Sequence, residues 1–224
     1  MKKVTVPLHS RFYDILIGED LISNFPIYLE GNLSRNFLAI ITDKNVEKVH
    51  LSRLVKALSA SGIETKILSI DPGEGSKSWK TLQMTVDWML ASKIERNDIV
   101  VALGGGVVGD LVGFAAAILR RGIRFIQCPT SLLAQVDSSV GGKTGINSVH
   151  GKNLVGAFYQ PSLVISDIST LNTIKERDFL AGYGEVVKYG LLGDYDFYCW
   201  LEKNFTKIKE RDPQTLTKAV AHSC

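Results

Sequence analysis

The sequence has few cysteines, no long apolar run and no leader-like start. Its three cysteines, Cys128, Cys199 and Cys224, are widely spaced and odd in number, so they form neither a C-x-x-C motif nor a disulfide framework. No apolar run reaches the length of a membrane span, and the residues after Met1-Lys2-Lys3 lack the apolar core of a signal peptide. We therefore expect a cytoplasmic protein without a membrane partner.

The sequence also has no large excess of positive or negative charge. The 26 Lys and Arg residues nearly balance the 23 Asp and Glu residues, which leaves a net charge of +3. The basic residues are scattered and no cluster is interleaved with aromatics, so nucleic acid is not expected as a partner. The 45% hydrophobic and 22% charged contents are ordinary for a globular protein. A chain of 224 residues can hold one large domain and part of a second.

The segment Gly104 to Asp110 is the most informative in the chain. It follows the apolar run 99–103, which predicts a buried strand, and precedes the Ala-rich run 111–119, which predicts a buried helix. Gly104, Gly106 and Gly109 satisfy the pattern G-x-G-x-x-G. Backbone without Cβ atoms can approach a pyrophosphate closely, and a helix N-terminus offers free N–H groups. The same pattern also occurs where a tight turn merely packs a helix on a sheet, so it is not decisive alone.

An acidic residue at a strand end supports a dinucleotide site. An ordinary Rossmann unit has an acid about 20 residues after its glycines, but the segment 124–131 contains none. Asp43 instead follows the apolar run 37–42, so it would lie at the sheet edge where open α/β sheets bind ligands. The alternative is that Asp43 only caps the next helix, and both roles can hold together.

Strand and helix patterns alternate along most of the chain. Segment 44–60 predicts a helix that ends at Gly62, and Ser76 is expected to cap a helix whose apolar face is Trp79, Leu82, Val86 and Met89. The fold class expected is α/β, with a Rossmann-like, mostly parallel sheet, helices on both faces, and then the start of an all-helical C-terminal domain. We place the boundary between residues 1–172 and residues 173–224. Further strands are expected at 4–8, 13–17, 63–70, 124–128 and 163–166.

A second concentration of glycine and polar residues spans 129–153. Gly142-Lys143-Thr144 is similar to the end of a Walker A motif, but Asp137 stands where that motif needs glycine. The sequence then predicts a glycine-rich loop carrying Lys143 and Lys152, which suit phosphate or carboxylate groups. An exposed basic loop is the alternative, and the neighbouring glycines favour a ligand.

Glu185 and Lys188 are three residues apart, so on a helix they share a face. They can form a surface ion pair, or they can be a metal-ligating carboxylate beside a substrate-binding lysine. The spacing does not decide between these two roles.

Taken together, these segments resemble the 3-dehydroquinate synthases, NAD- and zinc-dependent lyases of the sugar-phosphate cyclase superfamily. The resemblance covers nearly the whole chain, and the run from Val136 to Gly145 is its most specific part. It implies an NAD-binding α/β domain over residues 1–172 and the beginning of a helical metal and substrate domain over residues 173–224. It also implies a homodimer in which Arg121 reaches a substrate phosphate across the interface.

The resemblance implies roles at matching positions. The expected metal ligand is Glu185, for zinc or cobalt, and it is one of three that the family uses. Thr130-Ser131 replaces the usual Thr-Thr and keeps the hydroxyl. The residues expected around the substrate are Asp137, Lys143, Lys152, Asn153, Lys188 and Arg121. Those expected to bind NAD are Asp43, Pro72, Gly73, Glu74, Gly75, Ser76, Lys77, Gly104, Gly105, Gly106, Val107, Val108, Gly109, Asp110, Thr130, Ser131, Lys143, Lys152, Thr170, Leu171, Asn172 and Thr173.

The family reaction converts the small-molecule sugar phosphate 3-deoxy-D-arabino-heptulosonate 7-phosphate to 3-dehydroquinate and phosphate. This step belongs to the shikimate pathway, which leads through chorismate to the aromatic amino acids. Transient oxidation by NAD acidifies a neighbouring C–H bond so that phosphate can leave, and the ketone is then reduced again. Zinc polarises the carbonyl, and lysines neutralise the substrate anions.

The chain departs from the family in its histidines. Family members supply two zinc-binding histidines from the helical domain, and the family has a Gly-His-Thr-Phe-Gly-His context for its histidines. None of His9, His50, His150 and His222 has that context. We therefore expect a truncated chain that is inactive alone. The alternatives are an isolated NAD-binding fragment without activity and another sugar-phosphate cyclase, such as one that makes an inosose-type or valiolone-type ring.

Overall fold

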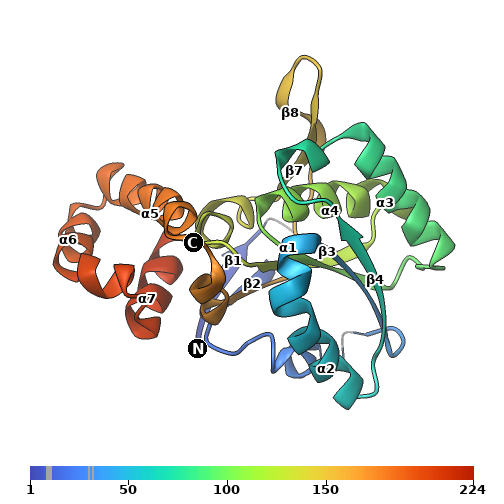
Figure 1. Cartoon of the computed structure of the whole chain (residues 1–224), viewed down its shortest axis with the longest axis horizontal. Helices are drawn as coiled ribbons and strands as arrows, with labels where there is room; N and C mark the ends of the chain where they lie inside the picture. Colours follow the sequence, from blue (N-terminus) through green and yellow to red (C-terminus); the bar gives the residue numbers. More distant parts are fainter. Residues whose placement is uncertain (9–11, 30, 32) are drawn as a thin grey trace.

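The computed structural model describes residues 1–8, 12–29, 31 and 33–224, so His9 lies outside the described residues. The described residues form a seven-stranded sheet with the order β1-β2-β9-β6-β5-β3-β4, and a separate two-stranded hairpin (Figure 1). The sheet strands are β1 (Lys2–Pro7), β2 (Phe12–Gly18), β3 (Phe37–Asp43), β4 (Glu64–Ile70), β5 (Ile99–Gly104), β6 (Arg124–Pro129) and β9 (Leu163–Asp167).

Strand order reverses between β3 and β5. All neighbouring pairs are parallel except β1 and β2. From β3 the chain moves outward to β4, then returns to the other side of β3 and continues through β5, β6 and β9. Ligands of open α/β sheets bind outside the carboxyl ends of the strands at such a reversal. In this chain that point lies between Asp43, which ends β3, and Gly104, which ends β5.

Helices cover both faces of the sheet (Figure 1). Helices α3 (Trp79–Ala91) and α4 (Gly106–Ile118) pack on the face that carries Ala39 and Ile41. The opposite face carries Leu38 and Ile40 and is covered by α2 (Ser52–Ala60). A helical segment joins β3 to α2 and consists of α1 (Lys44–Val46) and a π-helical turn at Glu47–Leu51. Because β3 is buried on both faces, its apolar run is continuous rather than alternating.

Every expected strand and the expected fold class are confirmed, and the register of one helix start is corrected. Ser78, not Ser76, caps α3, because the Ser78 hydroxyl accepts a hydrogen bond from the Thr81 amide. The hydroxyl of Ser76 instead donates to the Asp71 carbonyl oxygen at 2.6 Å. Trp79 is 58% exposed and does not belong to the apolar face, which Leu82 and Met89 form.

The region expected to be a glycine-rich loop is a β-hairpin instead. Strands β7 (Lys143–Ser148) and β8 (Gly151–Phe158) are antiparallel and project beside α4 (Figure 1). Two glycines permit their close approach, since a Cβ on Gly156 would lie 2.0 Å from the Thr144 carbonyl oxygen, and one on Gly145 would lie 2.6 Å from that of Val155. Gly145, which lies in the expected loop, and Gly156 therefore allow two backbones to pack tightly.

The C-terminal residues are helical, as expected. They form α5 (Glu176–Leu191), α6 (Tyr195–Lys209) and α7 (Pro213–Ser223). Phe197, Leu201 and Leu216 from these helices share a hydrophobic cluster with Ile15 and Ile17 of β2. The three helices therefore pack against the β2 end of the sheet rather than standing apart from it. In the part of the chain that the structure describes, no helix is long and apolar enough to cross a membrane.

Candidate functional site

A cavity of about 470 Å³ lies at the carboxyl ends of the central strands. Its walls come from the β3 end, from the turn after β4, from the β5–α4 turn and from the β6 end. The segment that follows β9 closes the last side. The lining residues expected from the sequence are Asp43, Pro72, Gly73, Gly105, Gly106, Val107, Thr130, Ser131 and Thr173. Nine positions from five separate segments of the expected cofactor set are thus brought to one cavity.

Asp43 performs the capping role that was one of its two expected roles. Its Oδ1 accepts hydrogen bonds from the amides of Asn45 at 2.8 Å and Val46 at 3.1 Å. Asp43 also lines the cavity, so a ligand can reach its carboxylate. Helix capping is therefore confirmed, and contact with a ribose stays a prediction.

The N-terminus of α4 opens into the cavity without a side-chain cap. Gly105 occupies the N-cap position and no side chain accepts from the first turn. A Cβ on Gly105 would meet only the Ser131 hydroxyl oxygen, at 3.6 Å, so the position is open. Free amides and open space beside a helix N-terminus fit a pyrophosphate. Gly104 and Gly109 serve packing instead, because Cβ atoms there would approach the Val108 and Gln127 side chains within 3.0 Å.

Four other positions of the expected cofactor set, Val108, Thr170, Leu171 and Asn172, do not line the cavity. Val108 is fully buried in the core. Thr170 and Leu171 are also fully buried, and the Thr170 hydroxyl donates to the Asp167 carbonyl oxygen at 2.7 Å. Asn172 is exposed but does not line the cavity. Of the segment 170–173, the cavity is lined by Thr173 alone.

The turn Glu74–Ser76 is held against the β7–β8 hairpin. The side-chain nitrogen of Asn147 donates to Glu74 Oε1 at 2.8 Å. The backbone N–H of Asn147 donates to the Lys77 carbonyl oxygen. The Asn147 side-chain oxygen accepts from the Asn153 amide at 2.9 Å. Glu74 is thereby oriented by Asn147, a residue whose role the sequence did not suggest. Gly75, the middle residue of this turn, has open space where a Cβ would stand.

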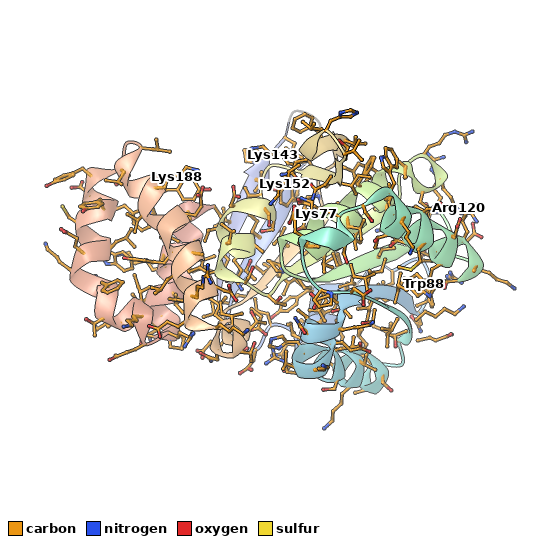
Figure 2. The ribbon with its side chains drawn as sticks, turned by 45° about the horizontal axis from the view of Figure 1, so that its top comes forward. Lys77, Trp88, Arg120, Lys143, Lys152 and Lys188 are labelled. Atoms are coloured by element: carbon orange, nitrogen blue, oxygen red, sulfur yellow. The ribbon has the colours of Figure 1, made fainter. Side chains whose placement is uncertain are left out.

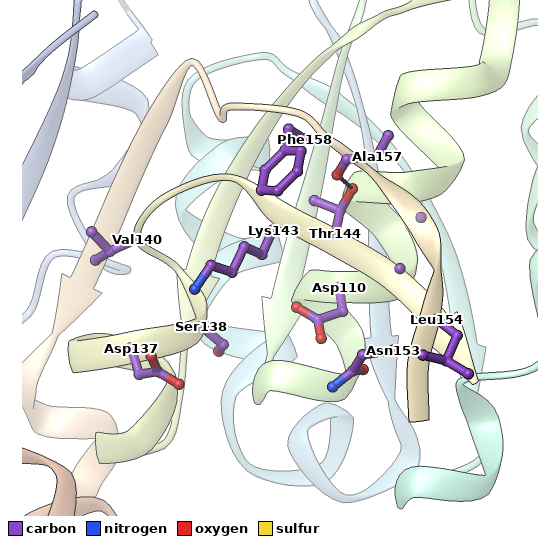
Figure 3. Close-up of a pocket in the computed structure, with 12 residues that line it drawn as sticks. Asp110, Asp137, Ser138, Val140, Lys143, Thr144, Asn153, Leu154, Ala157 and Phe158 are labelled. Atoms are coloured by element: carbon purple, nitrogen blue, oxygen red, sulfur yellow. Dashed lines mark hydrogen bonds between the residues drawn. The ribbon is translucent and has the colours of Figure 1, made fainter. Parts of the chain in front are cut away.

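A second cavity of about 430 Å³ lies under the hairpin, on the other side of the first turns of α4 (Figure 3). Asp137, Lys143 and Asn153, all expected around a substrate, line it together with Asp110. Figure 3 shows the Lys143 side chain extending toward the side of the cavity where Asp137 lies. The hairpin also contributes Phe158, which is 85% exposed, to the lining of this cavity. The sequence did not indicate Phe158, because the hairpin itself was not expected.

Lys77 does not face open solvent but joins three segments inside the protein. Its ammonium lies 2.6 Å from Asp110 Oδ2 and also donates to the side-chain oxygen of Asn153. Burial raises the pKa of Asp110 above its usual value, although hydrogen bonding and attraction to Lys77 act to lower it. The repulsion of Asp137 contributes to the increase in this pKa.

Of the other expected lysines, Lys143 lines the second cavity, whereas Lys152 and Lys188 do not (their positions are labelled in Figure 2). Lys143 and Lys152 are exposed on the hairpin. Within the described residues, neither ammonium takes part in an ion pair, so both are available to an anion. Lys188 of α5 pairs with Glu185 on the same helix, which raises the pKa of Lys188, and attraction to Asp137 contributes to the same shift.

The Glu185–Lys188 contact confirms the ion pair that the spacing allowed, and the metal-binding role of Glu185 stays a prediction. Its side chain is 18% exposed. No group of three or more His, Cys, Asp or Glu residues that could hold a metal ion occurs within the described ranges. Glu185 is accordingly one donor without companions in the described part of this chain.

Arg121 lies away from both cavities in the same chain. It follows the C-terminal end of α4 and is not among the residues that line either cavity. Arg120 and Arg121 both have positive φ, at 48° and 62°, and Arg121 is exposed.

His50 is a cavity residue that the sequence analysis missed. It is 5% exposed, and its Nε2 lies 2.8 Å from the Thr173 hydroxyl oxygen. Burial lowers the pKa of His50 below its usual value, and the nearby Arg53 guanidinium lowers it further. The signal available was a histidine within an amphipathic helix that directly follows Asp43.

Comparison with known family models gives two adjacent matches. Residues 67–181 match the 3-dehydroquinate synthase N-terminal model, and residues 182–224 match the 3-dehydroquinate synthase C-terminal model. The first match alone spans half of the chain.

Characterised sequences agree with this assignment. The chain is 56% identical over 220 residues to a 3-dehydroquinate synthase from a Ruegeria species, a match covering 98% of the chain and 59% of that relative. It is 54% identical over 223 residues to the enzyme of that name from Ruegeria pomeroyi, covering 100% of the chain and 60% of the relative. The chain therefore spans about three fifths of the length of these relatives.

Solved structures share the fold. A 2-epi-5-epi-valiolone synthase from Streptomyces hygroscopicus with NAD⁺ and Zn²⁺ bound aligns with a TM-score of 0.88 and 29% identity, covering 97% of this chain and 61% of that one. A 2-deoxy-scyllo-inosose synthase complexed with carbaglucose-6-phosphate, NAD⁺ and Co²⁺ aligns with a TM-score of 0.77 and 28% identity, covering 84% of this chain and 50% of that one. An iron-containing alcohol dehydrogenase, 17% identical, shares the fold alone.

Proposed function

Because the chain belongs to the 3-dehydroquinate synthase family, we propose that it forms the NAD-binding part and much of the sugar-phosphate site of such an enzyme. The observation that carries this proposal is the pair of cavities on either side of the first turns of α4. One cavity has the donors and open backbone that a dinucleotide needs. The other has the lysine and carboxylate that a phosphorylated polyol acid needs. We assign these functions to residues 1–172, with residues 173–224 as the beginning of the helical metal and substrate domain.

NAD would bind across the reversal point of the sheet. The uncapped amides after Gly105 would donate to the pyrophosphate, and Asp43 would accept from a ribose hydroxyl. Thr130, Ser131 and Thr173 offer hydroxyls along the same cavity. The support for this assignment is that five segments converge there and that Gly105 leaves room for a ligand. Bound NAD would supply reversible hydride acceptance.

The sugar phosphate would bind in the second cavity. The ammonium groups of Lys143 and Lys152 are unpaired in the described part of the chain and can neutralise phosphate or carboxylate oxygens. Asp137 and Asn153 provide an acceptor and an amide for the substrate hydroxyls. Lys188 reaches the same region from α5, next to Asp137. Substrate here would lie beside the α4 turn that borders the NAD cavity, so the two ligands could meet.

A divalent metal such as zinc or cobalt would polarise the transient carbonyl. Glu185 is the ligand that this chain would contribute, and its present partner is Lys188. One carboxylate is too little for a catalytic metal site, which usually takes three protein ligands. We therefore propose that the chain as given binds NAD but does not complete the lyase reaction alone.

Arg121 would act in a second copy of the chain. Two successive non-glycine residues with positive φ, Arg120 and Arg121, are costly, and strain of this kind is typical of functional positions. The Arg120 guanidinium anchors the turn by donating to the Ile94 carbonyl oxygen at 2.8 Å. Arg121 is exposed and lines neither of its own cavities. A homodimer that brings it to the partner's cavity is the arrangement we propose.

The second candidate is another sugar-phosphate cyclase, because the chain also aligns with the valiolone and inosose synthases, at 29% and 28% identity against 56% and 54% for the two 3-dehydroquinate synthases. The experiment that tests the proposal is calorimetric titration of the chain with NAD, followed by titration of the NAD complex with carbocyclic analogues of each substrate class. NAD binding together with preference for the seven-carbon acid analogue supports the synthase. Preference for a hexose phosphate analogue supports the other cyclases, and no NAD binding contradicts both.

A further inference from the structure

One helical turn near the cofactor cavity has an unusual geometry that the local sequence does not explain. Residues Glu47–Leu51 form a π-helical turn between α1 and α2. The segment 44–60 contains neither proline nor glycine, the usual local causes of a helix distortion. A π turn takes in one extra residue and often marks a functional site. The cause should therefore be sought in tertiary contacts, and His50 lies inside this turn.

The His50 ring donates a hydrogen bond rather than accepting one. Its Nε2 lies 2.8 Å from the hydroxyl oxygen of Thr173. That hydroxyl donates its single hydrogen to the Thr170 carbonyl oxygen, also at 2.8 Å. The hydrogen between the ring and Thr173 must then come from His50 Nε2. His50 thus fixes the side chain of the one residue in segment 170–173 that lines the cavity.

Thr173 ends the 3₁₀-helix Ile168–Thr173. The helix that carries His50 also contacts the beginning of this 3₁₀-helix, through Arg53. The Arg53 guanidinium lies 2.8 Å from the carboxylate of Asp167 and 3.1 Å from the Ser169 hydroxyl. The Asp167 side chain is fully buried and accepts from the Ser169 amide, which caps the 3₁₀-helix. One helix therefore holds the wall segment at its start through Arg53 and at its end through His50.

This helix also begins at the cavity, since Asp43 is its N-cap. Asp43, His50 and Thr173 line the same cavity from the two sides that a dinucleotide would touch. We infer that His50 is a positioning residue, which holds the Thr173 wall at a fixed place relative to Asp43 so that the cavity is formed before NAD arrives. The inference rests on the proposed NAD function, and nothing in the reaction itself requires a proton from His50.

A matched pair of variants tests the hydrogen bond while keeping the position polar. His50→Gln carries an amide nitrogen far enough from the backbone to reach Thr173, and His50→Asn carries the same amide one methylene shorter. By calorimetry we expect His50→Asn to bind NAD about five- to tenfold more weakly than the natural chain, as for loss of one hydrogen bond. His50→Gln should stay within about threefold. Lys56→Ala, at an exposed position on α2, should bind as the natural chain does.

Hydrogen exchange of the ligand-free chain provides a second readout. The amides of Ser169 to Thr173 should exchange faster in His50→Asn than in His50→Gln, and amides of β5 should be unchanged. Failure of the natural chain to bind NAD would overturn the proposed function. Normal NAD binding by a folded His50→Asn, with unchanged exchange in Ser169 to Thr173, would overturn the positioning role alone. If His50→Asn does not fold, equal affinity and exchange in His50→Phe and His50→Gln would overturn it.

Discussion

The ammonium of Lys77 lies 2.6 Å from the carboxylate of Asp110, and the two side chains are only 5% and 18% exposed. The pair joins the turn after β4 to the first turns of α4. The same ammonium donates to Asn153 of β8. A single lysine therefore connects the walls of both cavities. Because the Lys77 ammonium is paired with Asp110, we expect that a substitution of Lys77 would change NAD affinity at least partly by disturbing Asp110.

Replacing Lys77 with Met should lower the free energy of unfolding by about 1–3 kcal/mol, because it leaves a mostly buried carboxylate without its partner. Urea denaturation measures the change. In an Asp110→Asn background the same replacement should cost clearly less, since no charge is then left unpaired. An equal cost in both backgrounds would show that the lysine stabilises the fold without the ion pair.

Replacing Gly105 with Ala should weaken NAD binding at least tenfold, or about 1.4 kcal/mol, without unfolding the chain. The added Cβ meets only a hydroxyl at 3.6 Å, and the φ of −74° suits any residue. The methyl group would occupy the space next to the uncapped amides of α4. Calorimetry gives the affinity, and thermal unfolding checks the fold. Gly184→Ala in α5, also with open space at its Cα, is the matched control, and equal losses in both variants would refute a local effect.

Replacing Lys143 or Lys152 with Met should reduce affinity for a sugar-phosphate analogue while changing stability by no more than about 0.5 kcal/mol, as at other surface positions. Both side chains are exposed and have no ion-pair partner in the described residues. Titration of the NAD complex with the analogue measures the loss, and Lys80→Met on α3 serves as the control. A stability loss of several kcal/mol would instead show that these lysines hold the hairpin together.

The fold could be predicted from the sequence because its signals are local. Buried parallel strands such as Phe37–Asp43 and Ile99–Gly104 appear as uninterrupted apolar runs, and Asp43 and Gly104 then mark their carboxyl ends. The hairpin β7–β8 was missed for a physical reason. Gly145 and its neighbouring glycines predicted a loop, although Gly145 is needed where two strands touch. Closeness of two backbones is a property of the pair and cannot be seen in either strand alone.

Positions that line the cavity could be predicted where they end or directly follow a strand, as Asp43 and Gly105 do. Gly105 and Asp43 reach the cavity as expected. Lys77 and Thr170 were assigned to ligands, but their side chains are engaged with Asp110 and with the Asp167 carbonyl oxygen. Asn147 gave no signal, and His50 gave only its place in the helix that follows Asp43. The hydrogen bonds that make both residues important join positions more than 70 residues apart. Such long-range hydrogen bonds carry no periodicity from which to infer them.

The stability of the chain should depend on pH through His50. Burial and the Arg53 charge lower the pKa of the folded ring below its usual value of 6.5. The unfolded ring therefore takes up a proton at a higher pH than the folded one. The stabilisation is fully present above about pH 6.5 and is lost as the pH falls toward the folded pKa. Urea denaturation at pH 7.5 and 5.5 should show a smaller decrease for His50→Gln than for the natural chain, and parallel decreases would contradict this assignment.

The chain as given should bind NAD yet release no phosphate from the seven-carbon substrate. NAD contacts are proposed at the cavity that Asp43 and Gly105 line. Metal binding needs more than Glu185, and the described residues contain no group of three donors that could hold an ion. Without a held metal, nothing polarises the transient ketone. Phosphate release should be measured with NAD and zinc supplied, together with metal analysis of the dialysed chain. The Ruegeria pomeroyi relative, assayed in parallel, is the positive control. Turnover close to that of the relative, with one zinc per chain, would mean that this chain supplies further metal ligands besides Glu185.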